Sequence, residues 1–223
     1  MRLLIVAATP AEIAPIAEAL GPAQAGTLTR RVGGHEVDLL VTGVGMVATA
    51  ARTATALAHA RYDAAMNLGV CGSFHRTRPL ATVVHVTADG LPEFGVEDGD
   101  RFVSAAAIGL VDPNEAPFAS GLIVNHAPPL WPALAGLPSV TGATVNTVHG
   151  HEPSIAALLE RCNADVESME GAAFLYACLT AGIPCAQVRA ISNYVERRNR
   201  AAWKLPEAIA ALNATALAIV EGL

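Results

Sequence analysis

The chain has 223 residues, of which 52% are hydrophobic, 4% aromatic and 15% charged, and its formal net charge is -6. These values exclude a disordered chain and leave no electrostatic reason to bind a polyanion, so nucleic acid is not an expected partner. We expect a single domain over residues 1–223, because a chain of this length buries one substantial core.

The first quarter of the chain predicts a buried strand, a helix, a hairpin and a second helix. Leu3 to Ala8 is an apolar run typical of a buried strand, and a helix is expected from Pro10 to Leu20. In "LTRRVGGHEVDLLVTG" (28–43) two strand patterns flank a Gly-Gly pair, which favours a tight hairpin. The Ala-rich segment 46–61 is then expected to be helical.

The remaining elements alternate between strands and helices. We expect strands at 64–70, 82–87, 121–125, 140–148 and 185–193, and helices at 153–161, 169–181 and 206–222. Residues 88–120 hold several Gly and Pro residues without periodicity, so they predict a long loop of the kind that covers a functional site.

This order of elements predicts an α/β fold, a three-layer αβα sandwich around a central mixed, twisted sheet. Several strands end in a polar or Gly-containing turn, at Thr9, Gly43, Gly69 and Asn193. In open α/β sheets ligands bind beyond the strand ends, so we expect these turns to converge.

Cysteine spacing and hydropathy indicate the cellular compartment and argue against a zinc site or a membrane span. The four cysteines are widely spaced without a C-x-x-C pair, which favours buried free thiols and a reducing compartment over a zinc site. The apolar start is shorter than a signal peptide requires, and no window is long enough to span a membrane. We therefore expect a cytoplasmic protein with no membrane partner.

Two glutamates occupy positions where a carboxylate has either a structural or a chemical use. Glu12 at the opening of the first helix is either a charge favoured by the helix dipole or a general base for water. Glu170 in "VESMEGAAF" (166–174) precedes an apolar run that should bury it, so it needs hydrogen-bond donors. A ribose diol would supply two, whereas Glu167 is expected to face solvent.

The strand end "VRAISN" adds three polar candidates. A buried Arg189 requires an anionic partner and could orient Glu12 or a bound water. Asn193, next to Ser192, both donates and accepts, which suits the edge of a heterocyclic base. "HGHE" (149–152) lacks the further ligands of a metal site, so no metal or organic cofactor is expected.

Four stretches together resemble a known superfamily. "AATPAEI", "NLGVCGSF", "VESMEGAAF" and "PCAQVRAISNYVE" occur in the order found in the nucleoside phosphorylases and nucleosidases, over nearly the whole chain. The resemblance implies their fold, a purine nucleoside as substrate, and a homo-oligomer, dimeric or larger. Within the superfamily, "ESMEGAAF", "RAISNYVE" and "LPEFGVE" resemble most a branch of hydrolases that release hypoxanthine.

The resemblance also implies roles for individual residues. Glu12 matches the base that activates water, Met169 and Glu170 match the ribose-binding pair, and Arg189 with Ser192 matches the supporting strand. The Gly-containing turn beside the sugar and base corresponds to Gly69, Val70, Cys71 and Gly72. Asn193 stands where nucleosidases of adenine nucleosides carry Asp.

That departure favours a 6-oxopurine, because the amide of Asn193 donates to a 6-keto oxygen that a carboxylate would repel. Having Asn instead of Asp at position 193 also removes an obvious acid that could protonate the leaving base. Where phosphorylases carry Arg, this chain reads "TPAEI" and "AMNLGV", which favours water over phosphate as the nucleophile. The alternatives are a purine nucleoside phosphorylase, a methylthioadenosine/S-adenosylhomocysteine-type nucleosidase, or a nucleoside sensor without catalytic activity.

Overall fold

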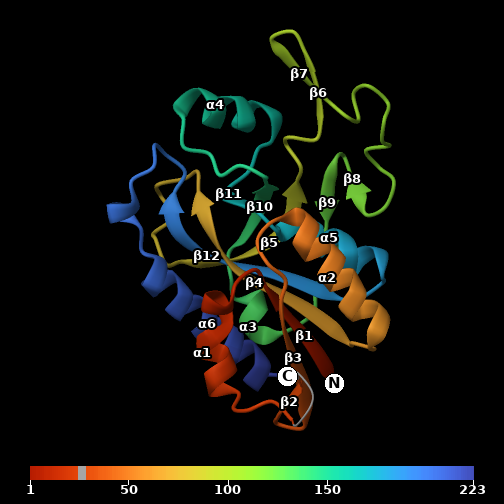
Figure 1. Ribbon diagram of the computed structural model, residues 1–223, viewed down its shortest axis with the longest axis vertical. Coiled ribbons are helices and arrows are strands. Elements are labelled where there is room, and N and C mark those ends of the chain that lie inside the picture. The colour runs from red at the N-terminus through yellow and green to blue at the C-terminus, as the bar shows by residue number, and fades with distance from the viewer. Residues whose placement is uncertain (25–28) are drawn as a thin grey trace.

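The chain forms a mixed sheet covered by helices on both faces (Figure 1). The computed structural model describes residues 1–24 and 29–223. The strands are β1 (Arg2–Ala7), β2 (Thr29–Val32), β3 (His35–Val41), β4 (Ala64–Ser73), β5 (Val83–Gly90), β6 (Gly95–Asp98), β7 (Arg101–Ser104), β8 (Phe118–Ala119), β9 (Leu122–Val124), β10 (Ser139–Thr144), β11 (Val166–Ser168) and β12 (Cys185–Tyr194). The helices are α1 (Pro10–Ala19), α2 (Met46–His59), α3 (Pro132–Ala135), α4 (Glu152–Arg161), α5 (Gly171–Thr180), a 3-10 turn η1 (Arg200–Ala202) and α6 (Leu205–Glu221).

The main sheet has the order β2-β3-β1-β4-β11-β10-β5-β9-β8, and β12 pairs with both β4 and β5. Strand β1 runs parallel to β3 and β4, and β12 runs parallel to β4, whereas β2, β8 and β9 are antiparallel to their neighbours. The predicted mixed sheet is therefore confirmed. Strands β4 and β12 lie at its centre, and their apolar side chains are buried because helices cover both faces.

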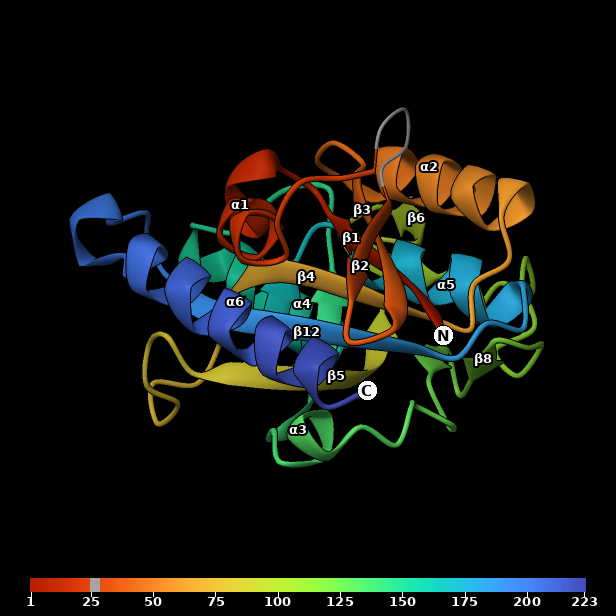
Figure 2. The same cartoon turned by 90° about the horizontal axis from the view of Figure 1, so that it is seen from below.

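The helices form two outer layers (Figure 2). Helices α1, α3 and α6 pack on one face around Ile5, Met66 and Val188. Helices α2 and α5 cover the other face, where Phe174 and Leu175 of α5 meet Leu4 of β1. The three-layer αβα sandwich predicted from the sequence is thus confirmed.

Several boundaries follow their sequence signals. The predicted hairpin joins β2 to β3 through Gly33 and Gly34, whose φ values of 56° and 85° suit a turn that glycine adopts readily. Leu28, the first residue of the predicted hairpin, lies outside the described residues. No helix in the described part of the chain is long and apolar enough to cross a membrane.

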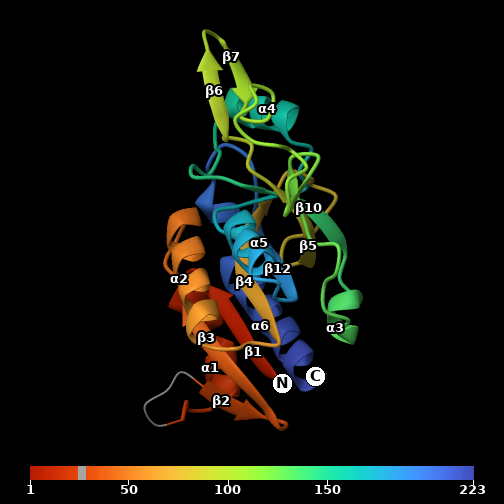
Figure 3. The ribbon, with the colours of Figure 1, turned by 90° about the vertical axis from the view of Figure 1, so that its right-hand side faces the viewer.

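The prediction for residues 88–120 was partly wrong. Residues 88–90 end strand β5, and the segment that follows contains the antiparallel hairpin β6–β7. This hairpin and α4 lie at one end of the molecule, away from both chain termini (Figure 3). The hairpin strands are four residues each and partly exposed, so they lack the strong alternation that reveals a longer strand.

Candidate active site

A cavity of about 320 Å³ lies where the predicted strand ends converge. Its walls come from the ends of β1, β4, β11 and β12, the first turn of α1, and the start of α6. The lining residues are Ala8, Thr9, Ala11, Glu12, Val44, Val70, Cys71, Gly72, Val148, Glu167, Ser168, Met169, Glu170, Ser192, Asn193, Trp203, Leu205 and Ile209. Every residue singled out from the sequence for a site role lines this cavity except Gly69 and Arg189, which lie beside Glu12.

Glu12 is buried and fixed by three donors. The backbone N–H and the hydroxyl of Thr9 donate to Oε2 at 2.9 and 2.8 Å, and the N–H of Val70 donates to Oε1 at 3.2 Å. The Thr9 contact is the helix-capping arrangement expected of a T-x-x-E sequence. The capping role and a position in the cavity wall therefore coexist in one side chain, and Glu12 joins α1 to β4.

Glu170 is the residue that precedes α5, and its side chain is also buried. The backbone N–H of Gly45, before α2, donates to Oε1 at 2.9 Å. Its other oxygen, Oε2, receives no hydrogen bond from the residues described. Since helix α5 begins at Gly171 and not at the predicted Met169, Glu170 is held outside the helix by Gly45 and stands at the cavity wall beside Met169.

Arg189 lies behind the cavity and is 1% exposed. Its Nη2 donates to Oδ1 of Asn67 at 2.5 Å, and its register partner across β4 is Gly69. A Cβ at position 69 would lie 2.2 Å from Nη1 of Arg189 and 3.2 Å from Oε1 of Glu12. The guanidinium and the Glu12 carboxylate therefore both approach the backbone of Gly69, and any side chain at this position would require one of them to shift.

Asn193 and Ser192 form a small polar group at the end of β12. The Ser192 hydroxyl lies within hydrogen-bond distance of Oδ1 of Asn193, at 2.8 Å, and of the carbonyl of Cys71, at 3.2 Å. The Asn193 amide nitrogen donates to the carbonyl of Tyr194 at 3.0 Å. Because that NH₂ group carries two hydrogens, one remains for a ligand in the cavity.

The expectation that Glu167 faces solvent was wrong. Glu167 lies in β11, is 3% exposed and lines the cavity. The N–H of His149 donates to Oε1 at 3.0 Å, and Nδ1 of His149 lies 2.5 Å from Oε2. Burial raises the pKa of Glu167, although the hydrogen bonds from His149 lower it and the nearby charge of Glu93 raises it further.

The charged side chains of the cavity wall are all acidic. Glu12, Glu167 and Glu170 are its only charged members among the described residues, so no Arg or Lys lines it. An anionic nucleophile such as phosphate would need cationic or multiple backbone N–H donors at this place. Three buried carboxylates instead suit a water molecule, a sugar diol and a developing positive charge.

The structure adds cavity residues that sequence reasoning missed. Thr9 was expected only as one of the converging strand ends, and the T-x-x-E capping pattern was the signal for its contact with Glu12. Trp203, Leu205 and Ile209 reach the cavity because the end of β12 is followed by η1 and α6, which no local pattern indicates. Within the described residues no three His, Cys, Asp or Glu side chains are placed to hold a metal ion.

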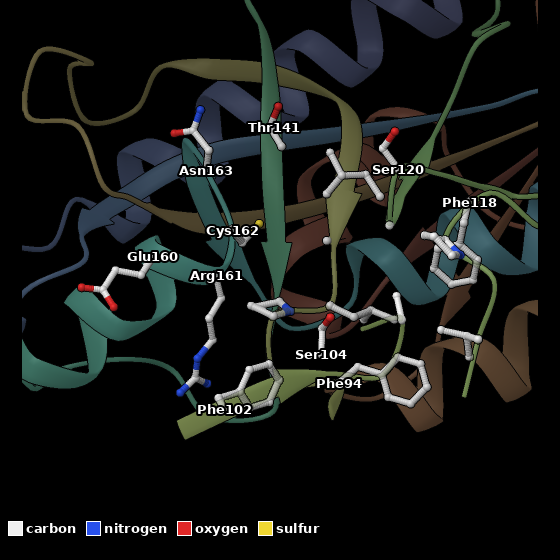
Figure 4. A pocket seen from close by; sticks show the side chains of 18 of the residues that line it. Phe94, Phe102, Ser104, Phe118, Ser120, Thr141, Glu160, Arg161, Cys162 and Asn163 are labelled. Carbon is white, nitrogen blue, oxygen red and sulfur yellow. The ribbon is translucent and has the colours of Figure 1, made fainter. Parts of the chain in front are cut away.

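A second cavity of about 720 Å³ lies elsewhere, under the hairpin β6–β7 (Figure 4). Phe94, Phe102, Arg161 and Cys162 are among its walls, and the guanidinium of Arg161 lies 4.1 Å from the ring centre of Phe102. No residue of 88–120 lines the cavity that contains Glu12. In the described chain this segment forms walls of the second cavity instead.

The fold and the cavity define the class. The model of the phosphorylase superfamily matches residues 2–221, so the chain belongs to that superfamily. The crystal structure of a 5'-methylthioadenosine/S-adenosylhomocysteine nucleosidase from Neisseria meningitidis in complex with methylthio-immucillin-A has the same fold. Its TM-score is 0.83 at 17% identity, covering 100% of this chain and 99% of that one.

Curated relatives narrow the class to a family. A futalosine hydrolase from Streptomyces coelicolor is 35% identical over 187 residues, covering 78% of this chain and 74% of that protein. A futalosine hydrolase from Acidothermus cellulolyticus is 31% identical over 214 residues, covering 94% and 86%. The chain belongs to the futalosine hydrolase family, which confirms the branch that "ESMEGAAF", "RAISNYVE" and "LPEFGVE" indicated. The native structure of the Helicobacter pylori futalosine hydrolase shares the fold, with a TM-score of 0.80 at 18% identity and coverage of 100% and 98%.

Proposed function

We propose that this protein is a futalosine hydrolase, which cleaves the N-glycosidic bond of futalosine with water and releases hypoxanthine for menaquinone biosynthesis. The observation that carries the proposal is the cavity itself. It brings Glu12, Glu170 and Asn193 together at the strand ends and contains three carboxylates but no cationic side chain among its described walls.

The proposed reaction assigns one task to each of these residues. Glu12 takes a proton from the attacking water, whose oxygen forms the new bond to C1′ of the ribose. The bond from C1′ to the base breaks, its electron pair leaves with the hypoxanthine, and the base gains a proton from solvent water. Glu170 accepts hydrogen bonds from the ribose hydroxyls through the oxygen that Gly45 leaves free, and its charge stabilises the cationic transition state.

The remaining predicted residues support these three. Arg189 and Gly69 pack behind Glu12, and the Ser192 hydroxyl donates to Oδ1 of the Asn193 amide. Met169, Val70, Cys71 and Gly72 supply the apolar and backbone surface against the sugar and the base. Asn193 donates to the 6-oxo oxygen of the leaving base, where the corresponding Asp of an adenine nucleosidase would be repelled.

A substrate panel tests the reaction class. We expect turnover of futalosine in phosphate-free buffer, with release of hypoxanthine measured by chromatography, and far slower turnover of inosine and methylthioadenosine. A requirement for phosphate would indicate a phosphorylase, and preferred cleavage of methylthioadenosine would indicate the adenine-type nucleosidase. Binding without turnover would indicate a sensor.

We also expect the enzyme to act in the cytoplasm as a homo-oligomer. Val44 lines the cavity and is 58% exposed, and Val47 on the first turn of α2 is 83% exposed. Exposed apolar side chains at the rim of a small cavity favour coverage by a second copy of the chain. Light scattering on the purified protein should therefore give a mass of twice 22.9 kDa or a higher multiple.

A further inference from the structure

Glu167 and Asn193 stand in one row across three adjacent strands. Glu167 in β11 is the register partner of Gly72 in β4, and Gly72 is the register partner of Asn193 in β12. Neighbouring strands lie about 4.8 Å apart, so roughly 10 Å separates the two outer backbones. Both outer side chains line the cavity, and the residue between them has no side chain.

Gly72, in the middle of this row, leaves space in the cavity because it has no side chain. A Cβ at position 72 would lie 2.8 Å from Cγ2 of Val195 and 3.2 Å from Nδ2 of Asn193. The Val195 side chain and the Asn193 amide would both have to shift to admit it. With glycine there, a flat ring can reach both outer side chains at once.

The two ends of the row have opposite hydrogen-bonding character. Asn193 has one amide hydrogen left after its bond to the Tyr194 carbonyl, so it presents a donor. Glu167 is held by two contacts from His149, and each of its oxygens has a further lone pair, so it presents acceptors. A 6-oxopurine matches this pattern, since its O6 accepts and its adjacent N1–H donates. Adenine reverses it, because its 6-amino group donates and its N1 accepts.

We propose that Glu167, positioned by His149, accepts a hydrogen bond from N1–H of the leaving 6-oxopurine and so selects against adenine, while Asn193 donates to O6. The inference rests on the proposed function and adds a base-selecting residue to it. Glu167 is almost fully buried, and a carboxylate in that state is stabilised by each additional donor. The lone pair of adenine N1 would meet the same carboxylate without a proton between them, which is a repulsive contact.

Substrate changes at N1 provide a direct test. We expect wild-type protein to lose about 10- to 100-fold in kcat/KM when N1 of futalosine carries a methyl group, which is the range of one lost hydrogen bond to a charged acceptor. In Glu167→Ala that penalty should shrink to within a few fold, because the acceptor is gone and the methyl group has room. An undiminished N1-methyl penalty in a folded Glu167→Ala protein would overturn the inference.

A second variant covers the case in which Glu167→Ala fails to fold. The amide of Glu167→Gln can donate to adenine N1, so the kcat/KM ratio of futalosine to its 6-amino analogue should fall about 10- to 100-fold. His149→Ala should lower the same ratio, because it removes the side-chain contact that positions Glu167 while leaving Glu167 itself in place. If His149 had only a structural role, the ratio would not change. The matched control Glu97→Gln, on the exposed hairpin β6–β7, should not alter it.

The experiments distinguish a wrong hydrolase function from a wrong role for Glu167. If wild-type protein does not cleave futalosine, the proposed function is wrong, whatever the variants do. If it cleaves futalosine but Glu167→Gln keeps the wild-type ratio, the assignment of Glu167 is wrong and the hydrolase assignment stands. Thermal melting of each variant identifies the folded proteins on which these ratios are measured.

Discussion

Glu12 has a position that suits both of the roles that the sequence presented as alternatives. It is the third residue of a capped helix and also a wall of the cavity, where the Val70 N–H donates to its second oxygen. The structural and chemical interpretations of this glutamate are therefore compatible.

Glu12→Gln removes the proposed base while retaining the shape of the side chain. We expect kcat for futalosine to fall by about 10²- to 10⁴-fold, the usual contribution of a general base. The dissociation constant for futalosine, measured by calorimetry, should change little. Glu18→Gln, an exposed change on the same helix, is the matched control, and equal turnover in the two variants would contradict the role of Glu12.

Gly69→Ala tests the close approach of Arg189. The added methyl group would lie 2.2 Å from Nη1, so the guanidinium or the strand must move. Overpacking of this kind typically destabilises by about 1–3 kcal/mol, and the shift should also displace Glu12 and lower kcat. Urea unfolding and kinetics check both effects. Gly136→Ala is the control, because the nearest atom lies 3.8 Å from the added methyl group, and its stability should be close to that of the wild type. If Gly69→Ala has the stability and kcat of the wild-type protein, the close approach of Arg189 is unimportant.

At the scale of elements, helix α6 holds the helix that carries Glu12. The side chain of Asn213 donates to the carbonyl of Glu12 at 2.8 Å and accepts from the N–H of Ile16 at 3.0 Å. These two groups lie one turn apart, and Pro15 weakens that turn because it has no N–H. Asn213 therefore ties two segments 201 residues apart in the sequence.

Asn213→Leu should leave the Glu12 carbonyl and the Ile16 N–H without this partner. We expect a loss of about 1–3 kcal/mol in the free energy of unfolding, together with a lower kcat because α1 is less well fixed. Denaturant titration and futalosine turnover measure the two effects. The exposed change Asn163→Ala serves as the control, and an unchanged stability of Asn213→Leu would refute the proposed link.

The start of α5 depends on a buried carboxylate. The Thr144 hydroxyl accepts from the N–H of Ala172 at 2.8 Å and donates to Asp89 at 2.9 Å, and Gln187 donates to the same carboxylate at 3.0 Å. Burial raises the pKa of Asp89 to about 6, although these hydrogen bonds lower it. This chain of contacts fixes the helix that follows Glu170.

The raised pKa of Asp89 predicts a pH dependence of stability. Between its ordinary value near 3.9 and about 6, the folded protein binds more protons at this site than the unfolded chain does. The contribution of Asp89 to the free energy of unfolding should therefore decrease as pH rises through this window, by on the order of 3 kcal/mol. Relative to Asp89→Asn, wild-type protein should lose stability from pH 4 to pH 7. A constant difference between the two proteins would show that Asp89 does not titrate there.

The sequence predicted those elements whose signals are local. The apolar runs of β1, β4 and β12 and the Gly33-Gly34 turn gave their strands and hairpin. Strand β11 was missed because its three residues, which directly precede the predicted helix 169–181, are too few to show an alternating pattern, and Glu167 was therefore expected to face solvent. The burial of Glu167 and the reach of Asn213 and Trp203 depend on tertiary contacts, which no local pattern contains.

At the scale of the whole molecule, the topology concentrates polar groups at one edge of the sheet. Strands β1, β4 and β12 run parallel, so their carboxyl ends meet, and β11 and α5 bring two further carboxylates to the same place. The family defines the fold and the class of chemistry, while the choice between nucleophiles follows from the charge of this cavity. The only charged side chains of its described wall, Glu12, Glu167 and Glu170, are acidic, which favours water over phosphate as the proposed nucleophile.

Isotope labelling tests this central claim most directly. Futalosine turned over in phosphate-free buffer containing H₂¹⁸O should give hypoxanthine without label and a sugar product with one ¹⁸O atom at C1′, detected by mass spectrometry in samples quenched before the free hemiacetal exchanges this oxygen with the solvent. The same product should form when phosphate is added. Turnover that occurs only with phosphate, and that yields a sugar 1-phosphate, would contradict the account.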